Sequence, residues 1–142
     1  MGKKRLRDMT WEDYGISKHR YEELRAFCLQ YREKKSKIKR GISGISYNAA
    51  RGGSGTGSPT ERDAVRNSIY QKDCEMIERA AIAASPEIYP YIIKSVTEGL
   101  PYRFIEYDNK YGKISMGKTE FYARRRLFFN LLDNLKKENS SI

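Results

Sequence analysis

Residues that serve enzymes and metal sites are scarce in this sequence. Its 142 residues include two cysteines and one histidine. Cys28 and Cys74 lie far apart, and neither CxxC nor any Cys/His spacing typical of zinc sites occurs. His19 has no carboxylate or cysteine at the spacing of a ligand set or a catalytic triad. The sequence therefore indicates a protein that is not an enzyme, uses no cofactor or metal and keeps two reduced thiols.

Long hydrophobic runs are also missing. No apolar stretch approaches the roughly 20 residues that a membrane-spanning helix needs. The basic start, Met1 to Arg7, is not followed by the apolar segment of a secretory signal. A glycine-rich stretch at 41–57 lacks the GxxxxGKS/T pattern and follows no apolar strand, which argues against a phosphate-binding loop. We expect a cytoplasmic protein with no membrane partner.

Positive charge is what the sequence has in excess. Its 28 Lys and Arg against 18 Asp and Glu give a formal net charge of +10. Residues 1–58 carry net +8, residues 59–100 net −2 and residues 101–142 net +4, so a neutral-to-acidic middle separates two basic ends. A basic surface attracts polyanions because binding releases counterions condensed on phosphates. Nucleic acid is thus one expected partner. The alternative is a basic protein whose charge serves only solubility.

Two long helical patterns fill residues 1–84. Ser17 is placed to cap a helix that runs from Lys18 to about Lys39. Ser58-Pro59 begins a second helix of similar length, and the Gly/Ser-rich stretch at 41–57 between them has the composition of a flexible linker. We therefore predict a helical hairpin. Its facing apolar residues are expected to be Tyr21, Leu24, Phe27, Cys28 and Tyr31 on the first helix and Val65, Ile69, Met76, Ile77, Ala80 and Ala83 on the second.

The remaining residues, 85–142, predict a helix-turn-helix unit. Ser85-Pro86 begins a helix that Gly99 caps. A short segment follows, then a turn at 109–113, and a long final helix from about Gly117 to about Lys137. A short helix joined to a long one by a Gly-containing turn is typical of this motif. Because no useful segment has the period of a strand, we expect an all-α fold.

The final helix has two dissimilar faces. At about 100° per residue, an apolar stripe of Phe121, Phe128, Leu132 and Leu135 lies opposite Thr119, Tyr122, Ala123, Arg126 and Asn130. Arginine can donate two hydrogen bonds to guanine, threonine can contact a thymine methyl, and alanine lets the backbone approach the bases. We expect this second face to contact duplex DNA, together with the nearby cations Lys118, Arg125, Lys113 and Arg103. The alternative is that Arg124 to Arg126 form only a solvated, charged face.

Several segments of the chain resemble a known family. Glu98-Gly-Leu-Pro-Tyr-Arg-Phe-Ile, Gly112-Lys-Ile-Ser and Thr119-Glu-Phe-Tyr-Ala-Arg-Arg-Arg-Leu-Phe-Phe are similar to the C-terminal helix-turn-helix of small phage-encoded transcription regulators. The closest likeness is to RinA-type late activators, and a more remote one is to region 4 of sigma factors. Asp13-Tyr-Gly-Ile-Ser with Tyr21-Glu-Glu-Leu also resembles prophage proteins of this type. The resemblance implies promoter binding in a bacterial host, with the host RNA polymerase as a partner.

These observations favour a sequence-specific, DNA-binding transcription regulator of a phage or prophage. The helical hairpin would then form a homo-oligomer, contact another protein or support the DNA-binding unit. A second hypothesis is a DNA-packaging component of the small-terminase type, which also joins a helix-turn-helix to a helical hairpin but works as a ring. A third is an inhibitor or adaptor whose basic surface binds an acidic protein.

Overall fold

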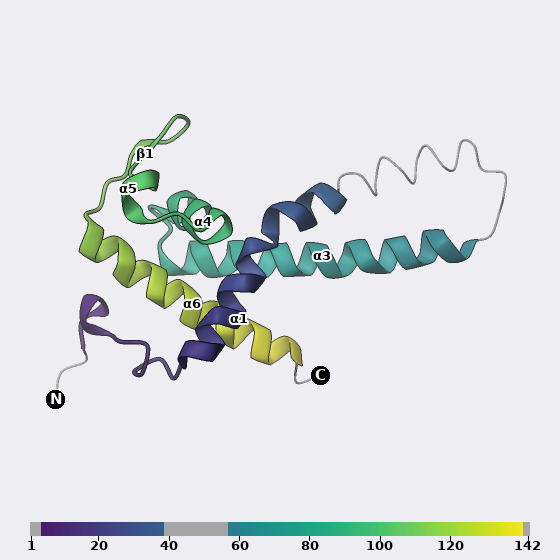
Figure 1. The fold of residues 1–142 in the computed structure, drawn as a ribbon, viewed down its shortest axis with the longest axis horizontal. Coiled ribbons are helices and arrows are strands. Elements are labelled where there is room, and N and C mark those ends of the chain that lie inside the picture. The colour runs from purple at the N-terminus through teal and green to yellow at the C-terminus, as the bar shows by residue number, and fades with distance from the viewer. Residues whose placement is uncertain (1–3, 39–56, 141–142) are drawn as a thin grey trace. The chain divides into compact units, whose positions relative to one another are not determined.

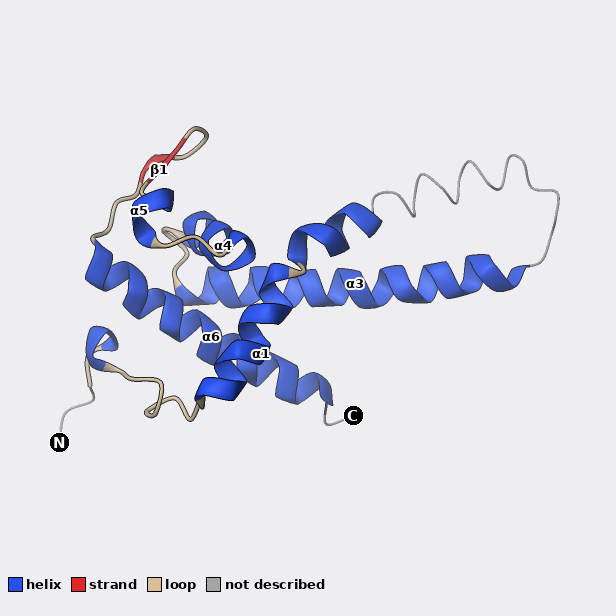
Figure 2. Ribbon diagram, in the orientation of Figure 1, coloured by secondary structure: helices blue, strands red, loops and turns tan. Residues whose placement is uncertain are grey.

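Helices make up most of the described chain, which confirms the predicted fold class (Figures 1 and 2). The computed structural model describes residues 4–38 and 57–140. Its elements include η1 (Leu6–Asp8), α1 (Lys18–Leu29), α3 (Gly57–Ala84), α4 (Tyr89–Glu98), α5 (Tyr102–Ile105), β1 (Tyr107–Asp108), β2 (Gly112–Lys113) and α6 (Lys118–Ser140). The two strands were not expected, because segments of two residues show no periodicity. The expected linker at 41–57 lies outside the described residues, apart from Gly57, the first residue of α3.

The chain divides into two compact units, and the division differs from the boundary expected between residues 84 and 85. One unit comprises Met1–Leu29 and Met76–Ile142, and the other comprises Gln30–Glu75. The reason is the packing of α1, which contacts α4 and α6. Leu24 and Cys28 on α1 are fully buried. The N-terminal helix therefore shares a core with the C-terminal helices.

Within the unit Gln30–Glu75, two helical segments run antiparallel, but only residues 31–38 of the first predicted helix take part, because α1 packs against α4 and α6. Residues 31–38 are helical and follow α1 after a turn at Gln30. The Lys34 ammonium lies 2.9 Å from a carboxylate oxygen of Asp73, and the Lys37 ammonium lies 5.6 Å from the centre of the Tyr70 ring. The later residue of segment 31–38 therefore contacts the earlier residue of α3, which makes the two segments antiparallel. Val65 and Ile69, which were expected on the inner face, are exposed.

Hydrogen bonds between residues close in the chain fix several turns and helix ends, and the signals predicted at Ser17 and Gly99 are confirmed, whereas α4 begins at Tyr89 instead of at Ser85. The Thr10 amide donates to the Asp13 carboxylate (2.9 Å), and the Asp13 amide donates to the Thr10 hydroxyl (3.1 Å). The Arg20 amide donates to the Ser17 hydroxyl over 3.1 Å, which caps α1. Gly99 ends α4 in the left-handed conformation, with φ of +68°. These short-range hydrogen bonds need no tertiary contact, so the sequence could predict them.

The helix α6 lies at the centre of the larger unit and is buried on more than one side. The expected apolar stripe is confirmed, since Phe121, Phe128 and Leu132 are fully buried. Phe129, which lies outside that stripe, is equally buried. Its ring contacts those of Trp11 and Tyr21, with centroids 5.9 and 5.2 Å away. The segment before α1 thus covers a second face of α6, which a one-faced amphipathic pattern did not predict.

Candidate nucleic-acid interface

Arg126, expected to contact bases, is engaged inside the protein. Its Nε donates to the carbonyl oxygen of Met9 over 3.0 Å, and its Nη2 donates to that of Arg7 over 3.2 Å. The guanidinium thereby holds the segment around η1 against α6. The prediction that Arg126 faces outward is wrong, because the N-terminal segment offers two carbonyl groups where solvent was expected.

The other two residues of the arginine cluster (Arg124, Arg125 and Arg126) are half-buried as well. Arg124 donates from Nη1 to the carbonyl oxygen of Ala84 over 3.2 Å. The Arg125 guanidinium lies over the Phe129 ring, 5.2 Å from its centre. The Nε atoms of Arg124 and Arg125 are buried and donate to no group in the part of the chain that the structure describes. The cluster is thus neither the exposed DNA-contacting group nor the solvated face that the sequence suggested.

Two more residues expected on the DNA-contacting face are covered by the protein, Ala123 fully and Tyr122 in part. Ala123 is 0% exposed, so the prediction that it lets the backbone approach bases is wrong. The Tyr122 hydroxyl accepts a hydrogen bond from the Tyr102 amide (2.9 Å), which fixes α5 to α6. Asn130 is half-buried. The physical reason is shared with Arg126: α6 has neighbours on both of its sides.

The remaining predicted residues do lie on the surface. Lys118 and Thr119 form the exposed first turn of α6, and Arg103 and Lys113 are exposed on α5 and β2. Within residues 4–38 and 57–140, the ammonium groups of Lys113 and Lys118 form no ion pair or hydrogen bond. These four residues lie on α5, on the hairpin formed by β1 and β2, and at the start of α6. The structure therefore moves the candidate interface from the middle of α6 to its N-terminal end.

The hairpin of β1 and β2 is a well-defined part of this surface. Tyr107 pairs with Lys113 and Asp108 pairs with Gly112 in antiparallel register. The Asp108 carboxylate accepts hydrogen bonds from the amides of Lys110 (2.7 Å) and Tyr111 (3.0 Å). These amides, followed by the ammonium of Lys94 at 3.3 Å, hold the pKa of Asp108 below its ordinary value. The carboxylate is thus charged at neutral pH and closes the turn.

A buried tyrosine supports the hairpin from beneath. The Tyr91 hydroxyl on α4 lies 3.0 Å from the carbonyl oxygen of Tyr111 and 2.8 Å from that of Gly112, to which it donates. Burial raises the pKa of this hydroxyl above its ordinary value, so it remains a donor at neutral pH. Gly112 has φ of +81°, a conformation that glycine adopts without strain. The backbone of the hairpin is therefore fixed to α4.

Exposed aromatic rings and cations lie close together along α5 and the hairpin. Phe104, Tyr107 and Tyr111 are 58%, 68% and 52% exposed. The Arg103 guanidinium lies 5.1 Å from the centre of the Phe104 ring, and the Lys110 ammonium lies 5.3 Å from that of Tyr111. We call this set the hairpin surface; it comprises Arg103, Phe104, Tyr107, Lys110, Tyr111 and Lys113. Sequence reasoning identified the turn, Arg103 and Lys113 but not the exposed rings, although the aromatic residues beside these cations were visible in the sequence.

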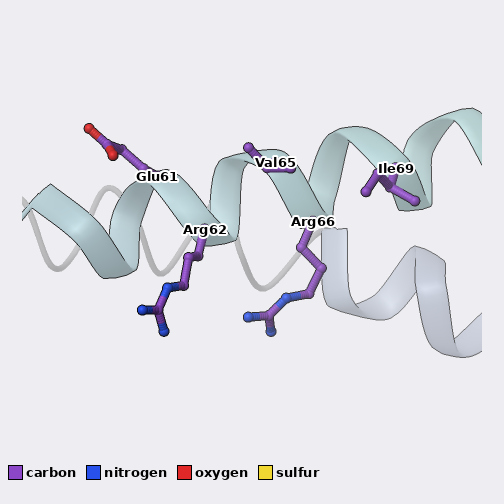
Figure 3. A pocket seen from close by; sticks show the side chains of 5 residues that line it. All are labelled: Glu61, Arg62, Val65, Arg66 and Ile69. Carbon is purple, nitrogen blue, oxygen red and sulfur yellow. The ribbon is translucent and has the colours of Figure 1, made fainter.

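A shallow groove lies along α3. Its volume is about 480 Å³, and its lining residues are Glu61, Arg62, Val65, Arg66 and Ile69. Figure 3 shows Arg62 and Arg66 extending to the same side of the helix. All five residues lie along one stretch of a single helix, so no second wall is described. We assign this groove no ligand.

Comparisons with known proteins add no further constraint. Neither a protein-family model nor a curated protein nor a solved structure matches the chain. None of the helices within residues 4–38 and 57–140 combines the length and the apolar character needed to cross a bilayer. The support for the candidate interface therefore comes from the positions and exposure of its own residues.

Proposed function

We propose that this protein binds duplex DNA through the N-terminal end of α6 and acts as a transcription regulator of the phage type. The observation that carries the proposal is the exposed position of Lys118 and Thr119 in the first turn of α6, with Lys113 and Arg103 on the preceding elements. The first amides of a helix have no partner within the helix, and the helix dipole favours anions there. Lysine side chains beside that end add direct attraction for phosphate.

The arrangement of three helices supports the same proposal. α4, α5 and α6 contact one another in pairs, and the long helix follows the short one across the hairpin. In a helix-turn-helix, the N-terminal residues of the last helix contact base edges. Sequence preference would then depend on Thr119, with its neighbours Lys118 and Glu120, which are also exposed. Arg126 and Ala123 have no part in it. Under this proposal, host RNA polymerase is the expected protein partner.

The test is the affinity for duplex DNA of two matched lysine variants. Lys118→Ala removes the cation at the start of α6, and Lys72→Ala removes an exposed lysine of α3 in the other unit. If about three phosphates are contacted, the wild-type log–log slope of affinity against salt should be about −3. Lys118→Ala should reduce this slope by about one unit. Lys72→Ala should leave it unchanged.

Fluorescence anisotropy with labelled duplexes at several stated salt concentrations measures both slopes. Selection from a random duplex pool then identifies the preferred site, and Thr119→Ala should weaken that preference. An affinity that does not depend on salt would contradict the proposal. Equal slopes for Lys118→Ala and Lys72→Ala would show that charge alone, without the placement on α6, causes binding.

A further inference from the structure

We propose that the hairpin surface is a platform on which unpaired bases of a single-stranded nucleic acid stack. The proposal goes beyond the binding of duplex DNA and does not depend on it. The first observation is the exposure of Phe104, Tyr107 and Tyr111, each more than half accessible. Phe121 and Phe128 on the adjoining helix are fully buried. Aromatic rings that the fold could bury, but presents on a protruding hairpin, are available for a partner (Figure 1).

The second observation is the fixed backbone beneath these rings. The Asp108 carboxylate closes the turn, and the Tyr91 hydroxyl binds two carbonyl groups of the hairpin. The Ile114 amide also donates to the carbonyl oxygen of Glu106 over 2.8 Å. A binding surface whose backbone is already ordered loses less entropy when it binds. The hairpin therefore holds its rings ready for a ligand.

The third observation is the charge that accompanies the rings. Arg103 precedes Phe104, and Lys110 and Lys113 lie on either side of Tyr111, while Lys94 pairs with Asp108 and offsets its charge. In a single strand each base is joined to a phosphate, so ring faces and negative charges are likewise close together. Every base has a ring face that can stack on an aromatic side chain, and cations can follow the phosphates. In a duplex those ring faces are stacked on one another, so this pattern fits an unpaired strand better.

Binding of labelled oligo-dT and oligo-rU of about 12 nucleotides, a length within the usual site sizes, tests the proposal. The main variant is Phe104→Ala/Tyr107→Ala, and Tyr107→Phe is its conservative control because it keeps the ring. Val65→Ala is a second control that removes an exposed apolar side chain from the other unit. Since Phe104 and Tyr107 are largely exposed, the thermal midpoint of the double variant should match that of the wild type.

The double variant should bind the oligonucleotide on the order of tenfold or more weakly, since each lost stacking contact is expected to cost about that factor. Both controls should bind as the wild type does. The strand bound more tightly, dT or rU, identifies the source of the ligand. Duplex affinity should change in Lys118→Ala and not in the double ring variant, which separates this proposal from the proposed function. If the double ring variant bound the oligonucleotide as tightly as the wild type does, the proposed platform would be wrong. It would also be wrong if the double ring variant lost its affinity for anionic phospholipid vesicles by the same factor as its affinity for the oligonucleotide.

Discussion

The arginine cluster and the hairpin surface look alike in sequence and differ in structure. Each combines cations with aromatic residues within a short stretch of chain. The guanidinium groups of the cluster bind backbone carbonyls of Met9, Arg7 and Ala84 or lie over Phe129. The rings and cations of the hairpin surface face outward, and the supporting hydrogen bonds are made by Asp108 and Tyr91 instead.

The difference shows that a cation's neighbours decide its role. α6 is a central helix, and its arginines meet carbonyl groups of segments that cover it. A charged donor that finds such acceptors stabilises the fold and is less available to a ligand. The aromatic rings of the hairpin surface, in contrast, are each more than half exposed. Variants in the two regions should therefore affect different properties: stability for α6 and binding for the hairpin surface.

The largest effect on stability is expected from Asp133→Ala, about two turns beyond the arginine cluster on α6. The Asp133 side chain is 2% exposed, accepts a hydrogen bond from Arg20 Nε over 2.6 Å and forms an ion pair with the Lys137 ammonium at 3.2 Å. Removing one member of a buried ion pair leaves the others uncompensated. We expect a loss of about 2–3 kcal/mol in the free energy of unfolding, less than for a fully buried pair, because Arg20 and Lys137 reach solvent.

Urea denaturation followed by circular dichroism measures this loss. Lys137→Ala is the matched control, since its ammonium is largely exposed and its pair should contribute less than about 1 kcal/mol. If both variants unfolded at the same urea concentration, the buried carboxylate would have no special role in holding α1 to α6.

An intermediate effect is expected from Arg126→Ala. The variant loses both hydrogen bonds to the carbonyl groups of Met9 and Arg7. Because the donor is charged, we expect a destabilisation of about 1–2 kcal/mol. The segment before α1 should also loosen, and the emission of the single tryptophan, Trp11, should report this. The affinity of Arg126→Ala for duplex DNA should match that of Lys72→Ala. A selective change of base preference with unaltered stability would restore Arg126 to the DNA-contacting face.

The smallest effect is expected from the charge of Asp108. Its pKa is lowered in the folded state, first by the amides of Lys110 and Tyr111 and then by Lys94. The charged form is thus favoured by folding, and its stabilisation is complete above the ordinary pKa of 3.8 and is lost as the pH falls through the lower, folded value. The thermal midpoint of the wild type should exceed that of Asp108→Asn at neutral pH, and the gap should close in acid. A gap that does not depend on pH would contradict this account of the turn.

Much of the local structure could be predicted, because it depends on groups close in the chain. The capping hydrogen bonds of Thr10, Asp13 and Ser17 join residues three apart. The left-handed Gly99 follows from the end of an apolar pattern before Pro101. Of the candidate site, the exposed residues Lys118, Thr119, Lys113 and Arg103 were named correctly as surface cations or polar groups. That they bind DNA stays a prediction.

The amino-acid sequence by itself determined the helical fold class, the start of α1 at Ser17, the end of α4 at Gly99, the turn before α6 and the apolar stripe of Phe121, Phe128 and Leu132, whereas the first helix ends at Leu29 instead of about Lys39 and α4 begins at Tyr89 instead of Ser85. Periodicity and capping depend on residues that are close in the chain, so they do not depend on tertiary neighbours. Only the tertiary structure decided that α6 is covered on a second side, since Trp11 meets Phe129 and Met9 meets Arg126 across more than a hundred residues of chain. A helical wheel contains no information about such distant neighbours. Contacts with these distant neighbours occupy the arginine cluster, whereas the rings and cations of the hairpin surface stay exposed.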